Sequence, residues 1–175
     1  MQIEELSSQA SLELLARVRL GRLACAKDSQ PYITPFYFAY HEGYIYSFST
    51  VGQKIEWMRI NPLVCIESDE IKSPQLWSSV IVFGRYEELP SSAEWQSTRE
   101  MVRNLLTQRE IWWEPGFAKT IIHESARPLA PVFFRIFIEQ ITGHRASLGT
   151  GSSGQERSST IKSNKDSWWK KRFAR

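Results

Sequence analysis

The chain has 175 residues, 42% hydrophobic and 23% charged, which permits one domain with a buried core and excludes a wholly disordered protein. Its formal net charge is +3, but the charges are unevenly distributed along the chain. Residues 151–175 hold seven Lys and Arg against two Asp and Glu, whereas residues 1–150 hold fifteen basic and seventeen acidic residues. The nearly neutral body carries no general nucleic-acid footprint, so we expect no nucleic-acid partner.

The cysteine content and the length of the apolar runs indicate whether the chain is a disulfide-rich, membrane-spanning or secreted protein. Cys25 and Cys65 are too few for a disulfide-rich scaffold, and we expect them to pack as small buried residues rather than act as catalytic thiols. No apolar stretch approaches the roughly 20 residues that span a bilayer, and the acidic N-terminus does not resemble a signal peptide. We therefore expect a cytoplasmic protein with no membrane span.

The first predicted elements are a helix and three antiparallel strands. Residues 11–19 place Leu and Val on one helical face, with Ser7 or Ser8 as N-cap and Gly21 as the stop. The strands that follow are rich in aromatic and β-branched residues and are separated by turn residues; they are expected at 22–27, 32–40 and 44–49. Pro31 and Pro35 cannot donate to a ladder, which predicts that the second strand is an edge strand or is irregular at these positions.

The second half continues the same pattern. A short helix at 52–60 ends before Pro62. Gly84 predicts a bulge in the long strand, and Ser91 or Ser92 opens the next helix with a capping box. The remaining elements are strands at 63–69, 76–89 and 132–142 and a helix at 91–110.

These elements predict the fold class. Six strands with local hairpin connections argue against a doubly wound parallel sheet and favour a mainly β protein, a six-stranded antiparallel barrel with peripheral helices. From residue 149 the composition changes to Gly, Ser and charged residues, so we predict a folded domain at 1–148 and a disordered basic tail at 149–175. The aromatic and cationic end of the tail could touch a membrane or nucleic acid, but a solvated tail is the favoured interpretation.

The segment around residues 49–54 contains the residue types of an anion-binding site. A strand ends in hydroxyl residues, turns through Gly52 and enters a helix with Lys54 in its first turn. Helix N-terminal N–H groups favour an anion, Ser49 and Thr50 can add hydroxyl hydrogen bonds, and Lys54 adds a positive charge. The set suits one phosphate, although ordinary helix capping explains the same residues when the segment is taken alone. The three histidines lack ligand spacing, so no metal site is predicted.

The order of several short motifs resembles the flavin-binding split-barrel family related to pyridoxamine 5′-phosphate oxidase, especially its nitroimidazole-resistance branch. The resemblance covers about residues 12–146. The motifs that carry it are Gly21-Arg22-Leu23-Ala24, Pro31-Tyr32-Ile33-Thr34-Pro35, Tyr46-Ser47-Phe48-Ser49 with Gly52 and Lys54, Asn61-Pro62, and Trp77-Ser78-Ser79-Val80 leading to Gly84.

This resemblance implies an FMN-binding homodimer with two flavins in grooves between the subunits. By position, Ser49, Thr50 and Lys54 would hold the phosphate, and Gln53 stands where the family often has a second cation, Arg. The other residues implied at the cofactor are Thr34, Phe36, Ser47 and Phe48, with Trp77, Ser78 and Ser79 from the partner subunit. The oxidase's own pyridoxal phosphate-binding arginines are not recognisable, so vitamin B6 oxidation is not predicted.

The implied function is an FMN-dependent oxidoreductase that acts on a small, flat substrate, with NADH or NADPH as a candidate donor. Two alternatives share the fold: a protein that binds deazaflavin or haem, and a non-catalytic binding or sensor protein. Aromatic residues that could wall a substrate pocket, although strand aromatics more often form core, are Tyr37, Tyr40, Trp112, Trp113 and Phe117.

Overall fold

The computed structural model describes residues 1–107, 121–122, 125–126 and 131–148. Its helices are α1 (Ser8–Arg17), α2 (Gln53–Ile60), the short 3₁₀ helix η1 (Ala93–Trp95) and α3 (Gln96–Thr107). Its strands are β1 (Gln2–Glu5), β2 (Leu20–Lys27), β3 (Gln30–Tyr37), β4 (Ala39–His41), β5 (Tyr44–Thr50), β6 (Leu63–Ser73), β7 (Leu76–Glu88), β8 (Ile121–Ile122), β9 (Ser125–Ala126) and β10 (Pro131–Ser147).

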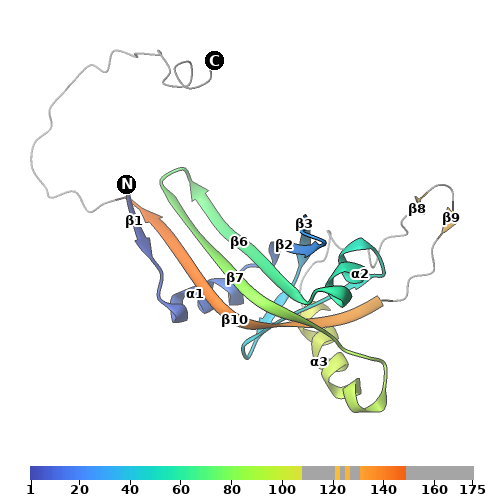
Figure 1. Ribbon diagram of the computed structural model, residues 1–175. Coiled ribbons are helices and arrows are strands. Elements are labelled where there is room, and N and C mark those ends of the chain that lie inside the picture. Colours follow the sequence, from blue (N-terminus) through green and yellow to red (C-terminus); the bar gives the residue numbers. More distant parts are fainter. Residues whose placement is uncertain (108–120, 123–124, 127–130, 149–175) are drawn as a thin grey trace, which may run out of the picture.

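Eight of these strands form one antiparallel sheet in the order β3-β2-β6-β7-β10-β5-β4, with β1 added beside β10. The sheet bends strongly, and α1 lies against β7 and β10 while α3 lies near β5 (Figure 1). Its two end strands, β3 and β4, follow one another in the chain with only Phe38 between them. The fold therefore belongs to the expected mainly β, split-barrel class. The sheet is open, with β3 and β4 at the two ends of the strand order.

The six predicted strands are present, with two differences. The segment predicted as one strand at 32–40 is divided, because β3 pairs with β2 whereas β4 pairs with β5. The proline argument for this segment is confirmed, since β3 lies at the end of the sheet and pairs on one side only, among the described residues. Strand β1 was not predicted, because its alternation is weak and it forms only by pairing with the end of β10.

Gly84 is required by close packing and is not itself a bulged residue. The register between β7 and β10 shifts between Ile138 and Gln140, so the extra residue lies on β10, opposite Gly84. A Cβ at position 84 would lie 2.5 Å from the Phe137 carbonyl oxygen and 2.6 Å from Ile136 Cγ2. Only glycine allows the two backbones to approach this closely.

One predicted helix end and one predicted capping interaction were wrong. Helix α1 begins after Ser7, whose hydroxyl accepts from the Ala10 amide, but it ends at Arg17 and Gly21 lies inside β2. A Cβ at Gly21 would lie 3.0 Å from the Glu67 carbonyl oxygen, so this glycine also serves strand packing. At the third helix, Ser92 is the cap residue but makes no side-chain cap hydrogen bond, so the predicted capping box does not form.

The hydrophobic core has two parts, one on each face of β5. Ile45, Ser47 and Ser49 point to the barrel interior, whereas Tyr46 and Phe48 point to the opposite face, which α3 covers. Because both faces of β5 are covered, five consecutive residues of this strand are buried. No helix among the described residues is long and apolar enough to cross a membrane.

Candidate functional site

The start of α2 presents helix N–H groups that no side chain of the described residues caps. Gly52 is the N-cap residue, has an extended backbone and makes no side-chain hydrogen bond; a Cβ there would meet nothing within 4 Å. The far end of the helix is anchored instead, because Asn61 Nδ2 donates to the Ala26 carbonyl oxygen at 3.0 Å and Trp57 packs edge-on against Tyr32. The helix is thus fixed to β2 and β3 while its N-terminus stays open to an anion.

Lys54, in the first turn of α2, lies near the Cys25 thiol on β2. Burial raises the pKa of this thiol, and the positive charge of Lys54 acts in the opposite direction. Burial also raises the pKa of Cys65, so both thiols remain protonated and neither is an activated nucleophile. The position of Lys54 therefore brings its ammonium group to the junction of α2 and β2, and Gln53 beside it is exposed.

The hydroxyls of Ser49 and Thr50 do not lie on the same side of β5. Neighbouring strand residues alternate, and the ladder pairs Ser49 with Val132 and Thr50 with Pro131. Ser49 is 4% exposed, and its hydroxyl makes no side-chain hydrogen bond within the described part of the chain. Among the described residues, the fully buried side-chain polar atoms without a partner are Ser11 Oγ and Arg19 Nη1, so the Ser49 oxygen is not sealed in the core. Because it faces the barrel interior and Thr50 does not, Ser49 is the stronger candidate for a ligand contact.

Thr34 lies on the same interior face of the β2–β3 ladder as Cys25. It pairs with the fully buried Leu23, and Cys25 pairs with Tyr32. The Thr34 hydroxyl makes one long contact, 3.3 Å, to the carbonyl oxygen of Pro35 and is only partly buried. Thr34 and Ser49 thus both face the barrel interior, and Lys54 lies near Cys25 on the same face of the β2–β3 ladder as Thr34.

Three residues implied by the resemblance lie in the core. Phe36 is 0% exposed and stacks on Phe38 at 5.3 Å, and Phe48 packs on Phe133 at 5.6 Å. The buried Ser47 hydroxyl donates to the Tyr37 carbonyl oxygen at 2.6 Å, which joins β5 to β3. These contacts give all three residues a structural role.

The residues at the start of β7 lie away from α2, at the end of the long β6–β7 hairpin (Figure 1). Trp77, Ser78 and Ser79 are partly buried and pair with Ala146, Arg145 and His144 of β10. Trp77 and Ser78 help to line an open pocket of about 180 Å³. One chain therefore separates the predicted site into an α2 part and a β7 part.

Sequence reasoning missed several residues of this pocket. Arg17, Lys72 and Arg145 line it together with Glu70 and Leu76, and they come from α1, β6 and β10. No local motif could have joined them, because the strand register alone brings them together. Among the aromatic residues considered for a substrate wall, Tyr37 is buried in the α3-side core and Tyr40 packs on the main core. Trp112, Trp113 and Phe117 lie outside the described residues, as does the 149–175 tail.

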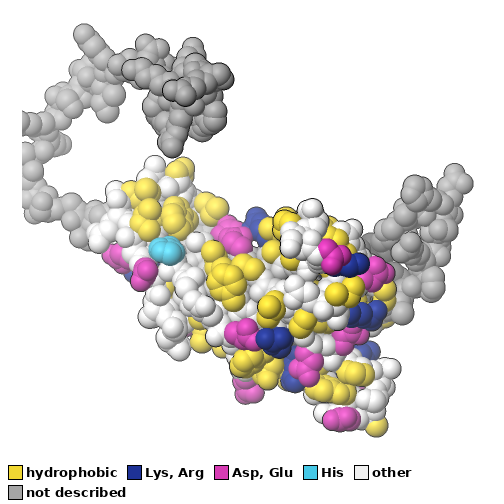
Figure 2. Space-filling model, viewed as in Figure 1, with side chains coloured by type: hydrophobic (Ala, Val, Ile, Leu, Met, Phe, Trp, Pro, Cys, Tyr) yellow, Lys and Arg dark blue, Asp and Glu magenta, His cyan; other side chains and the backbone are white. Residues whose placement is uncertain are grey.

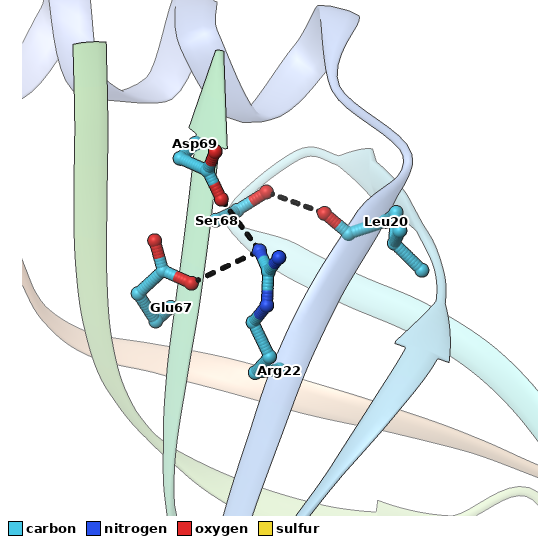
Figure 3. Close-up of polar contacts among 5 residues, drawn as sticks. All are labelled: Leu20, Arg22, Glu67, Ser68 and Asp69. Atoms are coloured by element: carbon cyan, nitrogen blue, oxygen red, sulfur yellow. Dashed lines mark hydrogen bonds and ion pairs between the residues drawn. The ribbon is translucent and has the colours of Figure 1, made fainter. Parts of the chain in front are cut away.

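A triad of charges occupies the outer face of the sheet (Figure 3). Arg22 on β2 pairs with Glu67 at 3.3 Å and also with Asp69, both on β6. Burial and the neighbouring Asp69 carboxylate raise the pKa of Glu67, and Arg22 offsets part of that effect. Ser68, between the two acids, points the other way and donates to the Leu20 carbonyl oxygen at 2.7 Å.

Comparison with known proteins shows the family of this chain. The family model described as pyridoxamine 5′-phosphate oxidase matches residues 7–145, which is most of the described chain. The chain belongs to that family. An uncharacterized protein of Rhizobium meliloti (strain 1021) is 38% identical over 149 residues, covering 85% of this chain and 99% of the relative.

Solved structures show the same fold. A FAD-binding protein from Mesorhizobium loti is 42% identical, with a TM-score of 0.71 over 85% of this chain and 99% of that one. A Bacteroides thetaiotaomicron protein provisionally named for 5-nitroimidazole antibiotic resistance is 16% identical, with a TM-score of 0.58 over 83% of this chain and 89% of that one. At that identity the second likeness shows the fold alone.

Proposed function

We propose that this family member is a flavin-dependent oxidoreductase that holds the flavin phosphate at the start of α2. The observation that carries the proposal is the start of α2, where Gly52 offers no side-chain cap and Lys54, in the first turn, adds a positive charge near β2. Ser49, on the interior face of β5, adds a hydroxyl. A phosphate oxygen would accept from the helix N–H groups and from Ser49, and Lys54 would offset its charge. Family membership and the FAD-binding Mesorhizobium loti relative support the same cofactor class.

The residues around this site fit the rest of a flavin. Thr34 lies on the same interior face as Cys25, which is near Lys54, and from there it would contact the ribityl chain or the ring. A bound flavin supplies hydride or electron transfer itself, so the protein needs to bind, orient and shield it. The chain's contribution is a rigid frame, because Asn61 and Trp57 hold α2 against β2 and β3 while the core side chains fix β5.

FMN is the cofactor that we propose, acting on a small, flat substrate. The single phosphate of FMN would be bound by one helix N-terminus, one hydroxyl group and one ammonium group. The open space beside Gly52 also leaves room for the second phosphate of FAD, which the Mesorhizobium loti relative is named for. Mass measurement of the ligand extracted from purified protein distinguishes the two; the proposal predicts the mass of FMN.

The phosphate site is tested by Lys54→Ala. Loss of a charge-assisted hydrogen bond should weaken flavin affinity by about 1.5–3 kcal/mol, measured by titrating the flavin-free protein with FMN. Lys54→Arg is the matched control, because it keeps the charge and should retain most of the affinity. Equal affinity of the wild type and Lys54→Ala would remove Lys54 from the site, and a purified protein with no visible flavin absorbance that ignores added FMN would refute the function.

We also propose that the protein is a homodimer formed through the outer face of the sheet. The register aligns Ile33, Ala24, Cys65 and Phe83 in one row across four strands, with Ile33 64% and Phe83 46% exposed. The neighbouring Ile81, Leu63 and Phe137 are also exposed, so the row widens into a patch. Figure 2 shows hydrophobic side chains gathered over β6, β7 and β10 with charges of both signs between them.

A second copy is the occupant that this face fits best. Exposed apolar patches of this kind mark interaction sites. The charged pairs on the same face, Arg22 with Glu67 and Arg85 with Glu139, present both signs, so a twofold-related copy can match each charge with its opposite. Such a dimer would bring Trp77, Ser78 and Ser79 of one subunit toward the flavin of the other, as the resemblance implies.

A further inference from the structure

The pocket beside the β6–β7 hairpin has the composition of an anion site. One row of the sheet crosses three strands, because Ser78 on β7 pairs with Glu70 on β6 and with Arg145 on β10. Helix α1 contacts β7 and β10 and ends at Arg17, which reaches Glu70 at 3.4 Å. Helix α1, the β6–β7 hairpin and β10 thus converge on a pocket of about 180 Å³.

The charges that line this pocket do not balance. Three of its side chains are cationic, namely Arg17, Lys72 and Arg145, whereas Glu70 is its one carboxylate. Arg17 pairs with Glu70, and Arg145 uses Nη2 to bind Glu4 of β1 at 3.1 Å. Within the described part of the chain, Lys72 makes no ion pair, so the pocket retains a positive surplus.

The existing ion pairs can be rearranged at little cost. The side chains of Arg17 and Arg145 are about half exposed, at 53% and 52%, and exposed pairs contribute little to stability. The Ser78 hydroxyl, between Glu70 and Arg145, makes no side-chain hydrogen bond to any residue that the structure describes. A hydroxyl and a guanidinium on neighbouring strands form a ready pair of donors for a carboxylate or phosphate.

We propose that this pocket binds the anionic group of the substrate, so that the substrate class is a small molecule with a carboxylate or phosphate. The inference rests on the proposed function, because Ser78 belongs to the segment that the dimer would bring to the partner's flavin. Ser78 and Arg145 donate to the anion, Lys72 adds charge, and Leu76 and Trp77 give the pocket an apolar part for the rest of the molecule.

The test compares three probes of similar size on the protein as purified: benzoate, its uncharged amide benzamide, and phenyl phosphate. Binding is followed by saturation-transfer NMR, and the flavin content of each sample is measured by absorbance. We expect the two anions to bind at least about tenfold more tightly than benzamide. The stronger of the two anions identifies the group that the pocket prefers.

Variants then locate the binding. Lys72→Ala and Arg145→Ala should each weaken anion binding by about tenfold and leave the flavin content unchanged. Arg103→Ala on α3 is the charge control and should change neither. Equal binding of benzoate and benzamide, or anion binding that both pocket variants retain, would overturn the proposal.

Flavin content separates this proposal from the proposed function. If Lys72→Ala or Arg145→Ala loses flavin, the pocket belongs to the cofactor and the substrate assignment is wrong. If the wild type itself binds no flavin, the proposed function fails. In that case anion binding lost in the pocket variants would identify an anion site with another use, and the substrate proposal would fall with the function.

Discussion

Ser47 and Ser49 show how two identical side chains on one strand face serve different ends. Both residues are buried and point to the barrel interior, and Ser47 donates to the Tyr37 carbonyl oxygen, whereas Ser49 makes no side-chain hydrogen bond to any residue that the structure describes. A satisfied buried hydroxyl stabilises the fold. The Ser49 oxygen is not one of the fully buried polar atoms without a partner in the described part of the chain, so it remains able to meet a ligand.

This difference predicts unequal effects of the same substitution. In flavin-free protein, Ser47→Ala should lower the free energy of unfolding by about 1 kcal/mol, because it removes a buried hydrogen bond, whereas Ser49→Ala should leave it nearly unchanged. Flavin affinity should fall in Ser49→Ala. Urea denaturation and FMN titration measure the two quantities, and equal destabilisation by both substitutions would show that Ser49 is an ordinary structural residue.

The contribution of Glu67 to the free energy of unfolding depends on pH. Its pKa is raised by burial and by Asp69, so the folded state disfavours the charged form relative to the unfolded chain. A group whose folded pKa is raised contributes stability below its unfolded pKa and loses that contribution as the pH rises through the folded value. At neutral pH the Glu67 charge is therefore a net cost, which Arg22 offsets in part (Figure 3).

Glu67→Gln should accordingly stabilise the protein at about pH 7, by less than about 1 kcal/mol because the site is partly exposed. The advantage should disappear as the pH falls through the range in which carboxylates are protonated. Urea denaturation across this pH range gives the comparison. A stability loss at neutral pH that is absent in acid would mean that the Arg22 pair outweighs the cost of burial.

At the scale of elements, the close pairing of β7 with β10 depends on Gly84. The extra residue on β10 opposite Gly84 bends that strand, and the missing side chain at position 84 lets the two backbones approach. The bend allows β10 to pair with β7 along most of its length and still reach β5 at its start. One close approach thus joins the long hairpin to the strand that carries the proposed phosphate site.

Gly84→Ala should lower the free energy of unfolding by about 1–3 kcal/mol, because the added methyl group overlaps the Phe137 carbonyl and the Ile136 side chain. Gly52→Ala is the matched comparison for stability, since its Cβ would enter open space on an extended backbone and should change stability much less. Thermal or urea denaturation of both variants checks the contrast; equal effects would contradict the packing argument.

At the scale of the whole molecule, the outer face of the sheet is the largest unexplained feature of a single chain. Ile33, Phe83 and Leu63 are between 46% and 64% exposed, although they lie in regular strands with a well-packed core on the opposite face. Burial of these side chains would stabilise a dimer by the hydrophobic effect. The same association would complete a site that one chain divides between α2 and β7.

Phe83→Glu should convert the dimer to a monomer and lower flavin content, because it buries a charge in the interface and separates the two halves of the site. Sedimentation analysis reports the oligomeric state, and absorbance reports the flavin. Ile3→Glu on β1 is the control, an exposed apolar side chain outside the row, and should leave the dimer intact. A wild-type monomer, or a Phe83→Glu dimer, would contradict the proposed interface.

Much of the fold could be predicted because its signals are local. Turn residues marked the hairpins, and Asp28, Ser29, Glu42 and Gly43 all have the positive φ angles of tight turns. Pro31 and Pro35 marked an edge strand, and Pro62 marked the end of α2. The position of Gly21 was misread because a glycine that serves strand packing and one that ends a helix look the same in sequence.

The candidate site was predictable only in part. The hydroxyls, glycine and lysine at 49–54 are contiguous, so the sequence could indicate a phosphate site there. That Ser49 and Thr50 lie on opposite faces, and that Phe36, Ser47 and Phe48 are core residues, depends on what covers each face of β5 and β3. An aromatic residue in a strand gives no sign of whether it will contact a ligand or another side chain.

The amino-acid sequence by itself determined the order of the predicted strands and turns, the family, and the segment that we propose for an anion, because each depends on neighbouring residues or on a fixed order of short motifs. Only the tertiary structure decided which serine bonds to a neighbouring strand, which hydrophobic side chains stay exposed, and which cations meet Ser78 in one pocket. The physical reason is that burial and charge balance depend on contacts between strands far apart in the chain, and the register of the sheet sets those contacts.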